Sequence, residues 1–155
     1  MMQHPIAARK IVVFAALAAA LVLFASSAVA QQRLGNLSTN PYDSRSTANP
    51  YGAGSPYQSD GINNPYSRFG SPYSNLSASN PFATQAPRLY DQQGNFRGRL
   101  STNPYDPDSI SNPYGRFGSP YSADSINNPF GAGSPYRFDS STNPFGTGWR
   151  LIGDD

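Results

Sequence analysis

The sequence predicts a mainly irregular, turn-rich internal repeat with a few short β-strands, arranged in two related halves. Three observations support this prediction: a proline-containing turn word that recurs along the chain, a duplication of longer segments, and a few short runs in which apolar and polar residues alternate. A partly disordered chain is the alternative, because the sequence has few large apolar side chains with which to form a core for a chain of this length.

Residues 1–30 have the pattern of an N-terminal signal peptide, which we expect to form a helix. A positive pair precedes an apolar run over residues 11–24, and Ala28 and Ala30 supply the small residues that a signal peptidase reads. Cleavage there would leave Gln31 as the first residue of an exported protein, periplasmic or extracellular. An uncleaved membrane anchor is the alternative, since the apolar run extended to Ala30 approaches the length that spans a bilayer.

The recurring word is Asn-Pro-aromatic or Ser-Pro-Tyr, and it occurs twelve times. The Asn words begin at residues 40, 49, 64, 80, 103, 112, 128 and 143, and the Ser words begin at 55, 71, 119 and 134. Proline presets the backbone for a tight turn, and the Asn or Ser before it can hydrogen-bond the backbone two residues on. Proline also disfavours a helical residue before it, so these closely spaced prolines exclude a long helix.

Longer segments repeat as well. Residues 37–43 return with the same sequence as residues 100–106, and a smaller unit of 15 or 16 residues separates alternate words. Such regular self-similarity indicates an internal repeat. We therefore expect one repeat domain over residues 31–155, with one half at about 33–91 and the other at about 96–155.

Short strands are predicted where each half begins and ends. Residues 33–39 alternate in polarity, and residues 150–154 repeat the Arg-Leu pair of residues 88–91. Between the halves, residues 88–100 hold two alternating segments around a Gly-Asn turn, which predicts a β-hairpin.

Composition removes most catalytic and electrostatic functions. Beyond residue 30 the chain has nine Arg and nine Asp, with no Lys, Glu, His or Cys. The usual nucleophile–base pairs, disulfides and thiolate metal sites are therefore missing, and we expect no enzyme and no cofactor. The net charge of this part is zero, which gives no broad electrostatic case for nucleic acid or for a membrane after signal removal.

Two local motifs have both a functional and a structural interpretation. Residues 106–109, Asp-Pro-Asp-Ser, could touch calcium, but they lack the ligand spacing of an EF-hand loop, so turn formation is preferred and no metal site is predicted. Arg-Phe pairs at 68–69, 116–117 and 137–138, with the Arg-Gly-Arg segment at 97–99, could stack on the bases of a single strand. Intramolecular cation–π contacts explain the same pattern equally well.

The aromatic ring of each word either packs under the chain or points outward. Inward packing into a shallow core is preferred, because large apolar side chains are more often structural than ligand-binding. Residues 103–121 are the best-preserved copy of the unit and provide the candidate positions, structural or binding. These positions are Asn103, Pro104, Tyr105, Asn112, Pro113, Tyr114, Ser119, Pro120 and Tyr121.

Three segments carry a resemblance to known proteins: residues 37–43, their copy at 100–106, and the longer word at 112–121. On these segments the chain resembles a group of small bacterial exported proteins that share the same words. The similarity covers most of residues 34–155. The function of that group is unknown, so the resemblance implies one repeat domain and no particular activity.

These observations favour an exported, non-catalytic structural or interaction protein that binds an envelope polymer or a protein surface. The alternative is a carbohydrate-binding or cell-wall-binding module in which outward tyrosines stack on sugars. Binding of single-stranded nucleic acid is a weaker alternative, given the zero net charge.

Overall fold

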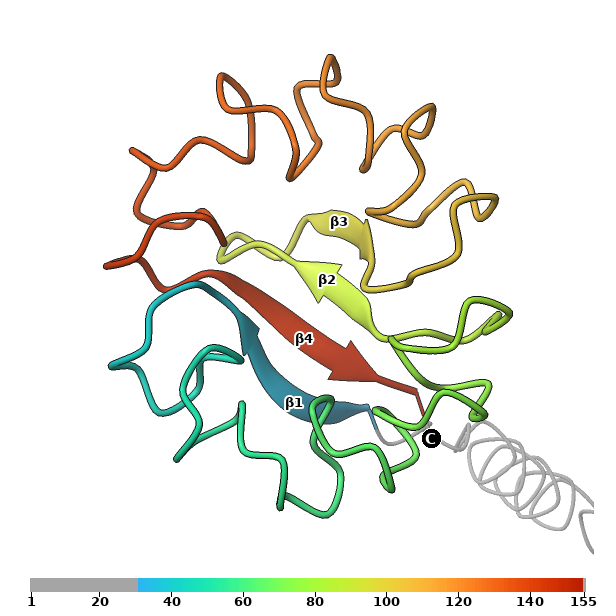
Figure 1. Ribbon diagram of the computed structural model, residues 1–155. Coiled ribbons are helices and arrows are strands. Elements are labelled where there is room, and N and C mark those ends of the chain that lie inside the picture. Colours follow the sequence, from blue (N-terminus) through green and yellow to red (C-terminus); the bar gives the residue numbers. More distant parts are fainter. Residues whose placement is uncertain (1–30, 155) are drawn as a thin grey trace, which may run out of the picture. The chain divides into compact units, whose positions relative to one another are not determined.

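The computed structural model describes residues 31–154, which contain four strands and no helix. β1 (Gln32–Leu37), β2 (Arg88–Tyr90), β3 (Phe96–Arg99) and β4 (Trp149–Gly153) form one antiparallel sheet in the order β1-β4-β2-β3 (Figure 1). The predicted small β fold with an irregular remainder is thus confirmed. Over this range no helix exists that could cross a membrane.

The predicted signal helix and the cleavage residues Ala28 and Ala30 lie outside the described residues. Gln31, the expected first residue after cleavage, is the first residue described, and it is exposed just before β1. β2 and β3 fall within the segment for which the sequence predicts a hairpin. They pair antiparallel around Gly94, whose amide donates to the Asp91 carbonyl at 3.1 Å.

Strand pairing is symmetric about the centre of the sheet. Leu89 of β2 lies opposite Leu151 of β4, and the flanking pairs are Arg88 with Ile152 and Tyr90 with Arg150. β1 then pairs with β4 on one side, and β3 pairs with β2 on the other. The first strand of each sequence half therefore pairs with the last strand of the other half, so the sheet is complete only when both halves contribute.

Two long arms of consecutive turns fill most of the remaining chain. In the first arm (residues 43–83) and the second arm (residues 106–146), the amide of about every third residue donates to the carbonyl three positions earlier. Ser46 thus donates to Asp43 at 3.0 Å, and Asn49 donates to Ser46 at 3.1 Å. Each arm has one longer step of four residues, ending at Ser71 in the first and at Ser119 in the second.

Each arm lies along one outer strand of the sheet (Figure 1). The Asn36 amide of β1 donates to the Arg45 carbonyl at 2.7 Å, and the Arg99 amide of β3 donates to the Asp108 carbonyl at the same distance. Sheet edges with unpaired backbone groups invite aggregation, and here the arms satisfy part of both edges. The close approach depends on two glycines with positive φ, Gly35 (+124°) and Gly98 (+94°).

The hydrophobic core is small and lies against one side chain face of the sheet. Along β4, Trp149 and Leu151 are buried while Arg150 and Ile152 are only half-buried, as expected for a strand with one covered face. The core cluster consists of Leu34, Phe69, Leu89, Ala132, Trp149 and Leu151.

Buried serines supplement this core with hydrogen bonds. The Ser46 hydroxyl donates to the Ser38 carbonyl at 3.0 Å and accepts the Ala48 amide at 3.1 Å, and Ser109 donates in the same way to Ser101 at 2.9 Å. Five serines are buried three residues before an Asn word, and the hydroxyl of each accepts the amide two residues on: Ser46, Ser77, Ser109, Ser125 and Ser140. A polar group is buried without penalty when it is hydrogen-bonded, so these serines let the arms pack closely with little apolar surface.

The preferred prediction that the word rings pack inward is wrong. All twelve rings point outward, with exposures from 76% to 98%. The reason is the turn geometry: Asn or Ser occupies the first turn position and uses its side chain on the backbone, so proline and the ring become the two outer corners. Side chains of the intervening turns, such as Ala53 and Phe69, face the sheet instead.

We predict that Asn112→Ala destabilises the fold by about 1–2 kcal/mol, because two hydrogen bonds of roughly 1 kcal/mol each are lost. Asn112 Oδ1 accepts the Tyr114 amide at 3.0 Å, and its Nδ2 donates to the Asp106 carbonyl at 3.1 Å. Urea unfolding measures the difference. Ser119→Ala removes one longer bond of 3.3 Å to Tyr121 and should have a smaller effect; equal losses would contradict this account of the turn.

Candidate functional site

The three predicted words of residues 103–121 lie at and within the second arm, and each closes a turn on its own side chain. The ring residue's amide donates to Oδ1 of Asn103 at 2.9 Å, to Oδ1 of Asn112 at 3.0 Å, and to Oγ of Ser119 at 3.3 Å. Their rings are exposed by 89% at Tyr105, 96% at Tyr114 and 92% at Tyr121. The structure therefore presents all three tyrosines to solvent on fixed turns.

These rings have no aromatic or cationic partner within residues 31–154. Their hydroxyls make no hydrogen bond to the part of the chain that the structure describes. Beneath them, Asn112 uses both Oδ1 and Nδ2 on the backbone, and Asn103 uses Oδ1. The remaining nine words have the same outward ring. The surface thus carries a series of unpartnered aromatic rings at the corners of both arms.

Short links join an Asn word to the next Ser word: Gly-Ala-Gly at residues 52–54 and 131–133, and Arg-Phe-Gly at residues 68–70 and 116–118. The phenylalanines of the Arg-Phe-Gly links are buried, unlike the rings of the words. Phe69 and Phe117 are buried, and the preceding arginine covers each ring, with guanidinium-to-centroid distances of 4.9 Å for Arg68 and 5.3 Å for Arg116. Arg97 also lies 6.0 Å from the ring of Trp149. These three arginines make the cation–π contacts within the fold that the structural interpretation expects. The third Arg-Phe pair does not, because Arg137 pairs with Asp139 and Phe138 is exposed.

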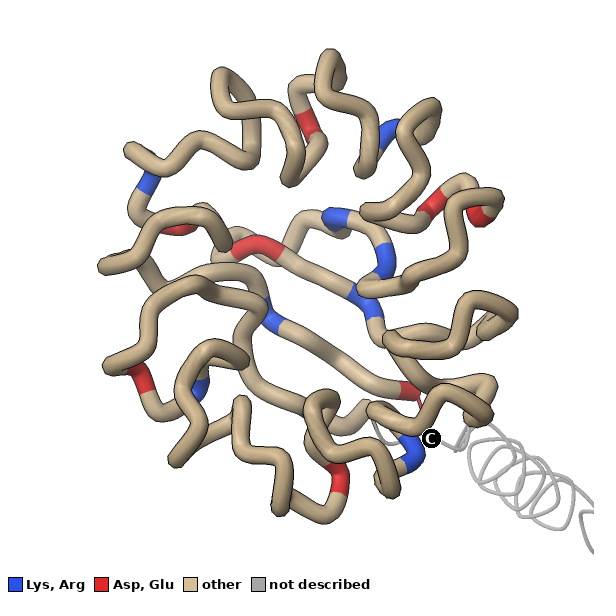
Figure 2. The backbone as a smooth tube through the Cα atoms, viewed as in Figure 1, with Lys and Arg blue, Asp and Glu red and all other residues tan. Residues whose placement is uncertain are grey.

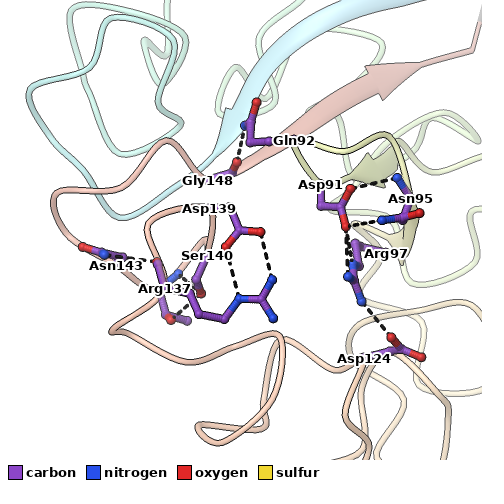
Figure 3. Close-up of polar contacts among 11 residues, drawn as sticks. Asp91, Gln92, Asn95, Arg97, Asp124, Arg137, Asp139, Ser140, Asn143 and Gly148 are labelled. Carbon is purple, nitrogen blue, oxygen red and sulfur yellow. Dashed lines mark hydrogen bonds and ion pairs between the residues drawn. The ribbon is translucent and has the colours of Figure 1, made fainter.

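A second group of residues, which the sequence did not reveal, forms an ionic cluster. Figure 3 shows Asp91, Asn95, Arg97 and Asp124 of this cluster, and Arg116 joins it through Asp124. Arg97 donates from Nη2 to Asp91 Oδ2 at 2.9 Å and from Nη1 to Asp124 Oδ1 at 2.7 Å. Asn95 adds two bonds to Asp91, at 2.8 and 2.9 Å, and Arg116 binds Asp124 at 2.7 Å. The cluster ties the β2–β3 hairpin to the second arm.

The electrostatics of this cluster keep its carboxylates ionised. Burial acts to raise the pKa of Asp91, but hydrogen bonds from Asn95 and Arg97 outweigh it and leave the pKa below its ordinary value. For Asp124 the hydrogen bond from Arg116 is the largest cause of a lowered pKa. A general acid at neutral pH needs a raised pKa, so these two groups are suited to holding the fold together.

The Asp106–Ser109 segment forms a turn. Asp106 Oδ1 accepts the Asp108 amide at 2.9 Å, and the Asp108 carbonyl accepts the Arg99 amide of β3. Over residues 31–154 no three acidic or histidine side chains gather as a metal site would require. Figure 2 shows that charges of both signs are spread over the two arms and the sheet. The charged residues of both signs are therefore interspersed along the backbone.

No protein-family model matches the chain, and neither a curated protein nor a solved structure matches it. The outward rings and the contacts that fix them are the features from which a function can be inferred.

We predict that the fold loses stability in acid. The folded-state pKa values of Asp91, Asp124 and Asp139 are lowered, so their ionised forms stabilise the fold above the ordinary value of 3.8. This stabilisation disappears as pH falls through the lower folded-state values. Thermal unfolding between pH 7 and pH 2 measures the loss.

Asp91→Asn isolates the contribution of the ionic cluster. We expect it to cost about 2 kcal/mol at pH 7, because Arg97 loses its charged partner Asp91 and keeps only Asp124, and to flatten the acid dependence. Asp106→Asn keeps an acceptor for the turn and serves as the control with little loss. An Asp91→Asn profile that runs parallel to the wild type below pH 4 would show that this carboxylate does not contribute.

Proposed function

We propose that this chain is an exported, non-catalytic repeat protein that binds an extended polymer or a protein surface through its outward aromatic turns. The observation that carries the proposal is the exposure of all twelve word rings. Apolar surface in contact with water is unfavourable, and a soluble protein that exposes many large rings commonly uses them for binding. Tyrosine suits this role because its ring packs against a partner while its hydroxyl remains wet.

The turns favour binding because they hold the rings in place before a partner arrives. Six of the Asn words are anchored twice, by Oδ1 to the ring residue and by Nδ2 to a carbonyl six residues earlier. A side chain on a fixed backbone loses less conformational freedom on binding than one on a mobile loop. The rings therefore form a preorganised surface.

Matching contacts in the two arms support the repeat interpretation. The bridge between Asn36 and Ser46 corresponds to that between Arg99 and Ser109, both shifted by 63 residues. Each half carries six words. Two similar rows of rings on one body could engage one long partner at several points, which raises the overall affinity without stronger single contacts.

A carbohydrate-binding or cell-wall-binding module is the second candidate, and the outward tyrosines favour it. Sugar rings can stack on exposed aromatic faces, and the free tyrosine hydroxyls can exchange hydrogen bonds with sugar hydroxyls. The Asn side chains do not serve as sugar acceptors in this proposal, since Asn103 and Asn112 use Oδ1 within their own turns. Stacking would therefore supply most of the recognition.

We predict that replacing Tyr105, Tyr114 and Tyr121 together by Ala weakens polymer binding by about tenfold or more, with little change in stability. Sedimentation with insoluble peptidoglycan and polysaccharides, together with a glycan array, measures binding, and thermal unfolding checks the fold. The matched variant replaces Tyr51, Tyr57 and Tyr66 in the first arm. Unchanged polymer and protein binding by both triple variants would overturn the proposal.

Export has its own test. We predict that protein recovered from the periplasm or medium begins at Gln31, which intact-mass measurement would show. Replacing Ala28 and Ala30 by Leu should leave the longer precursor, because the peptidase requires small side chains there. Full-length wild-type protein confined to the cytoplasm would contradict the proposed export.

A further inference from the structure

The two arms fill corresponding positions beside the sheet with different side chains. A Cβ added at Gly35 would lie 2.6 Å from Cβ of Ala53, and one added at Gly98 would lie 2.7 Å from Cβ of Phe117. Ala53 therefore stands against β1 as Phe117 stands against β3. The difference arises because the Gly-Ala-Gly link comes first in one arm and the Arg-Phe-Gly link comes first in the other.

In the second half this position is filled by packed rings. Phe117 meets Phe96 edge to face at 5.2 Å between centroids, and Phe96 in turn meets Tyr90 at 5.8 Å. Arg33 stands two residues before Gly35, as Phe96 stands two residues before Gly98. The first half thus has an alanine and an arginine where the second has two phenylalanines.

The smaller side chains leave a pocket of about 360 Å³ between β1 and the first arm. A volume of this size lies within the range of small-molecule sites. The lining residues are Arg33, Leu34, Gly35, Ser44, Arg45, Tyr51, Gly52, Ala53 and Gln58. The pocket is therefore not a general property of the repeat, and it belongs to the first half.

The lining combines an apolar floor with a positive rim. Leu34 and Ala53 are buried, whereas Arg33 and Arg45 are exposed, and no carboxylate lines the pocket. Arg33 donates to Asn36 Oδ1 at 3.0 Å and makes no ion pair within the described chain. Arg45 faces Asp43 at 3.5 Å with much of its side chain in water, an arrangement that contributes little to stability. Both guanidinium groups are available to an anion.

The pocket continues along β1 into a smaller one. The second pocket, of about 110 Å³, shares Arg33, Leu34 and Gln58 with the first. Its one carboxylate, Asp60, is already held by Gln32 at 3.0 Å and by Arg68 at 3.3 Å. A ligand longer than one ring could therefore extend along this edge without meeting a free negative charge.

We propose that this pocket binds a carboxylate-bearing sugar unit of an acidic polysaccharide. The apolar face of the sugar ring packs on Leu34 and Ala53 beside the Tyr51 ring, and its carboxylate binds Arg33 and Arg45. Guanidinium and carboxylate groups form short, charge-assisted hydrogen bonds, which explains the preference for an acidic sugar. This inference rests on the proposed function and names the class of polymer that the first arm selects.

The direct test is titration of the protein recovered from the exporting host with a short galacturonic acid oligomer, followed by amide NMR and calorimetry. We expect saturable binding with shifts at Gly35, Tyr51 and Ala53. The matching neutral galactose oligomer should bind about tenfold more weakly, since it lacks the charged hydrogen bonds. Acetate should not saturate, because it lacks the apolar ring.

Variants then assign the site. Ala53→Phe places in the first arm the ring that Phe117 supplies in the second, and it should abolish binding of the acidic oligomer. Should Ala53→Phe not fold, the exposed Arg33→Gln and Arg45→Gln variants still test the site, each with an expected loss of about tenfold. Arg137→Gln changes the net charge equally in the second arm, away from the pocket, and should have no effect.

Outcomes for the pocket and for the aromatic turns can be told apart. Equal binding of acidic and neutral oligomers, no binding of either, or equal losses for Arg33→Gln and Arg137→Gln, would overturn the pocket proposal. Polymer binding that still depends on Tyr105, Tyr114 and Tyr121 would then leave the proposed function standing. Conversely, binding of the acidic oligomer that Arg33→Gln weakens, without any dependence on those tyrosines, would retain the pocket alone.

Discussion

The fold depends on hydrogen bonds from Asn and Ser side chains to the backbone of their own turns. Four strands of three to six residues pair only a small part of the backbone, and no helix is present over residues 31–154 to pair the rest. Buried amides and carbonyls must nevertheless find partners. In the arms, three-residue turns pair every third amide, and the Asn and Ser oxygens pair further amides between them. The repeated turns that contain these words therefore pair the backbone of the arms, as helices or strands do in other proteins.

The same constraint decides where the aromatic residues go. A turn held by its first side chain leaves proline and the next residue as outer corners, so a ring at that corner cannot reach the sheet. The fully buried cluster consequently comes from the strands and from the links, where Phe69 and Ala132 face inward, and partly buried side chains of the arms pack against it. Buried serines and the Asp91–Arg97 pair supplement the small apolar core. The rings remain available for a partner because the fold does not use them.

Local signals in the sequence were sufficient to predict the strands and the absence of a helix over residues 31–154. The hairpin at residues 88–100 follows from alternation around Gly94, and proline spacing excludes helices without knowledge of the fold. Predicting whether the rings point inward or outward required the position of each residue within its turn. Residue preferences for burial do not provide this position. The contact of Arg97 with Asp124 joins residues 27 positions apart, and it arises only when β3 meets the second arm. Predicting the pocket from the sequence would have required a comparison of Ala53 with Phe117. The exchanged order of the two links was the one sequence signal for this difference.

The exchanged order of the two links changes the packing in both halves of the protein. The Arg-Phe-Gly link adds one residue and a large ring, so each arm contains one long step and one short link in opposite order. Phe69 of the first arm then packs near Leu34 and Gly153 of the sheet, while the smaller Ala132 occupies the matching link of the second arm. Beside Gly98 of β3, the Phe117 ring fills the space between the strand and the second arm. Beside Gly35 of β1, the smaller Ala53 leaves a pocket between the strand and the first arm. Symmetric strand pairing therefore supports two arms of similar backbone whose side chains form different surfaces.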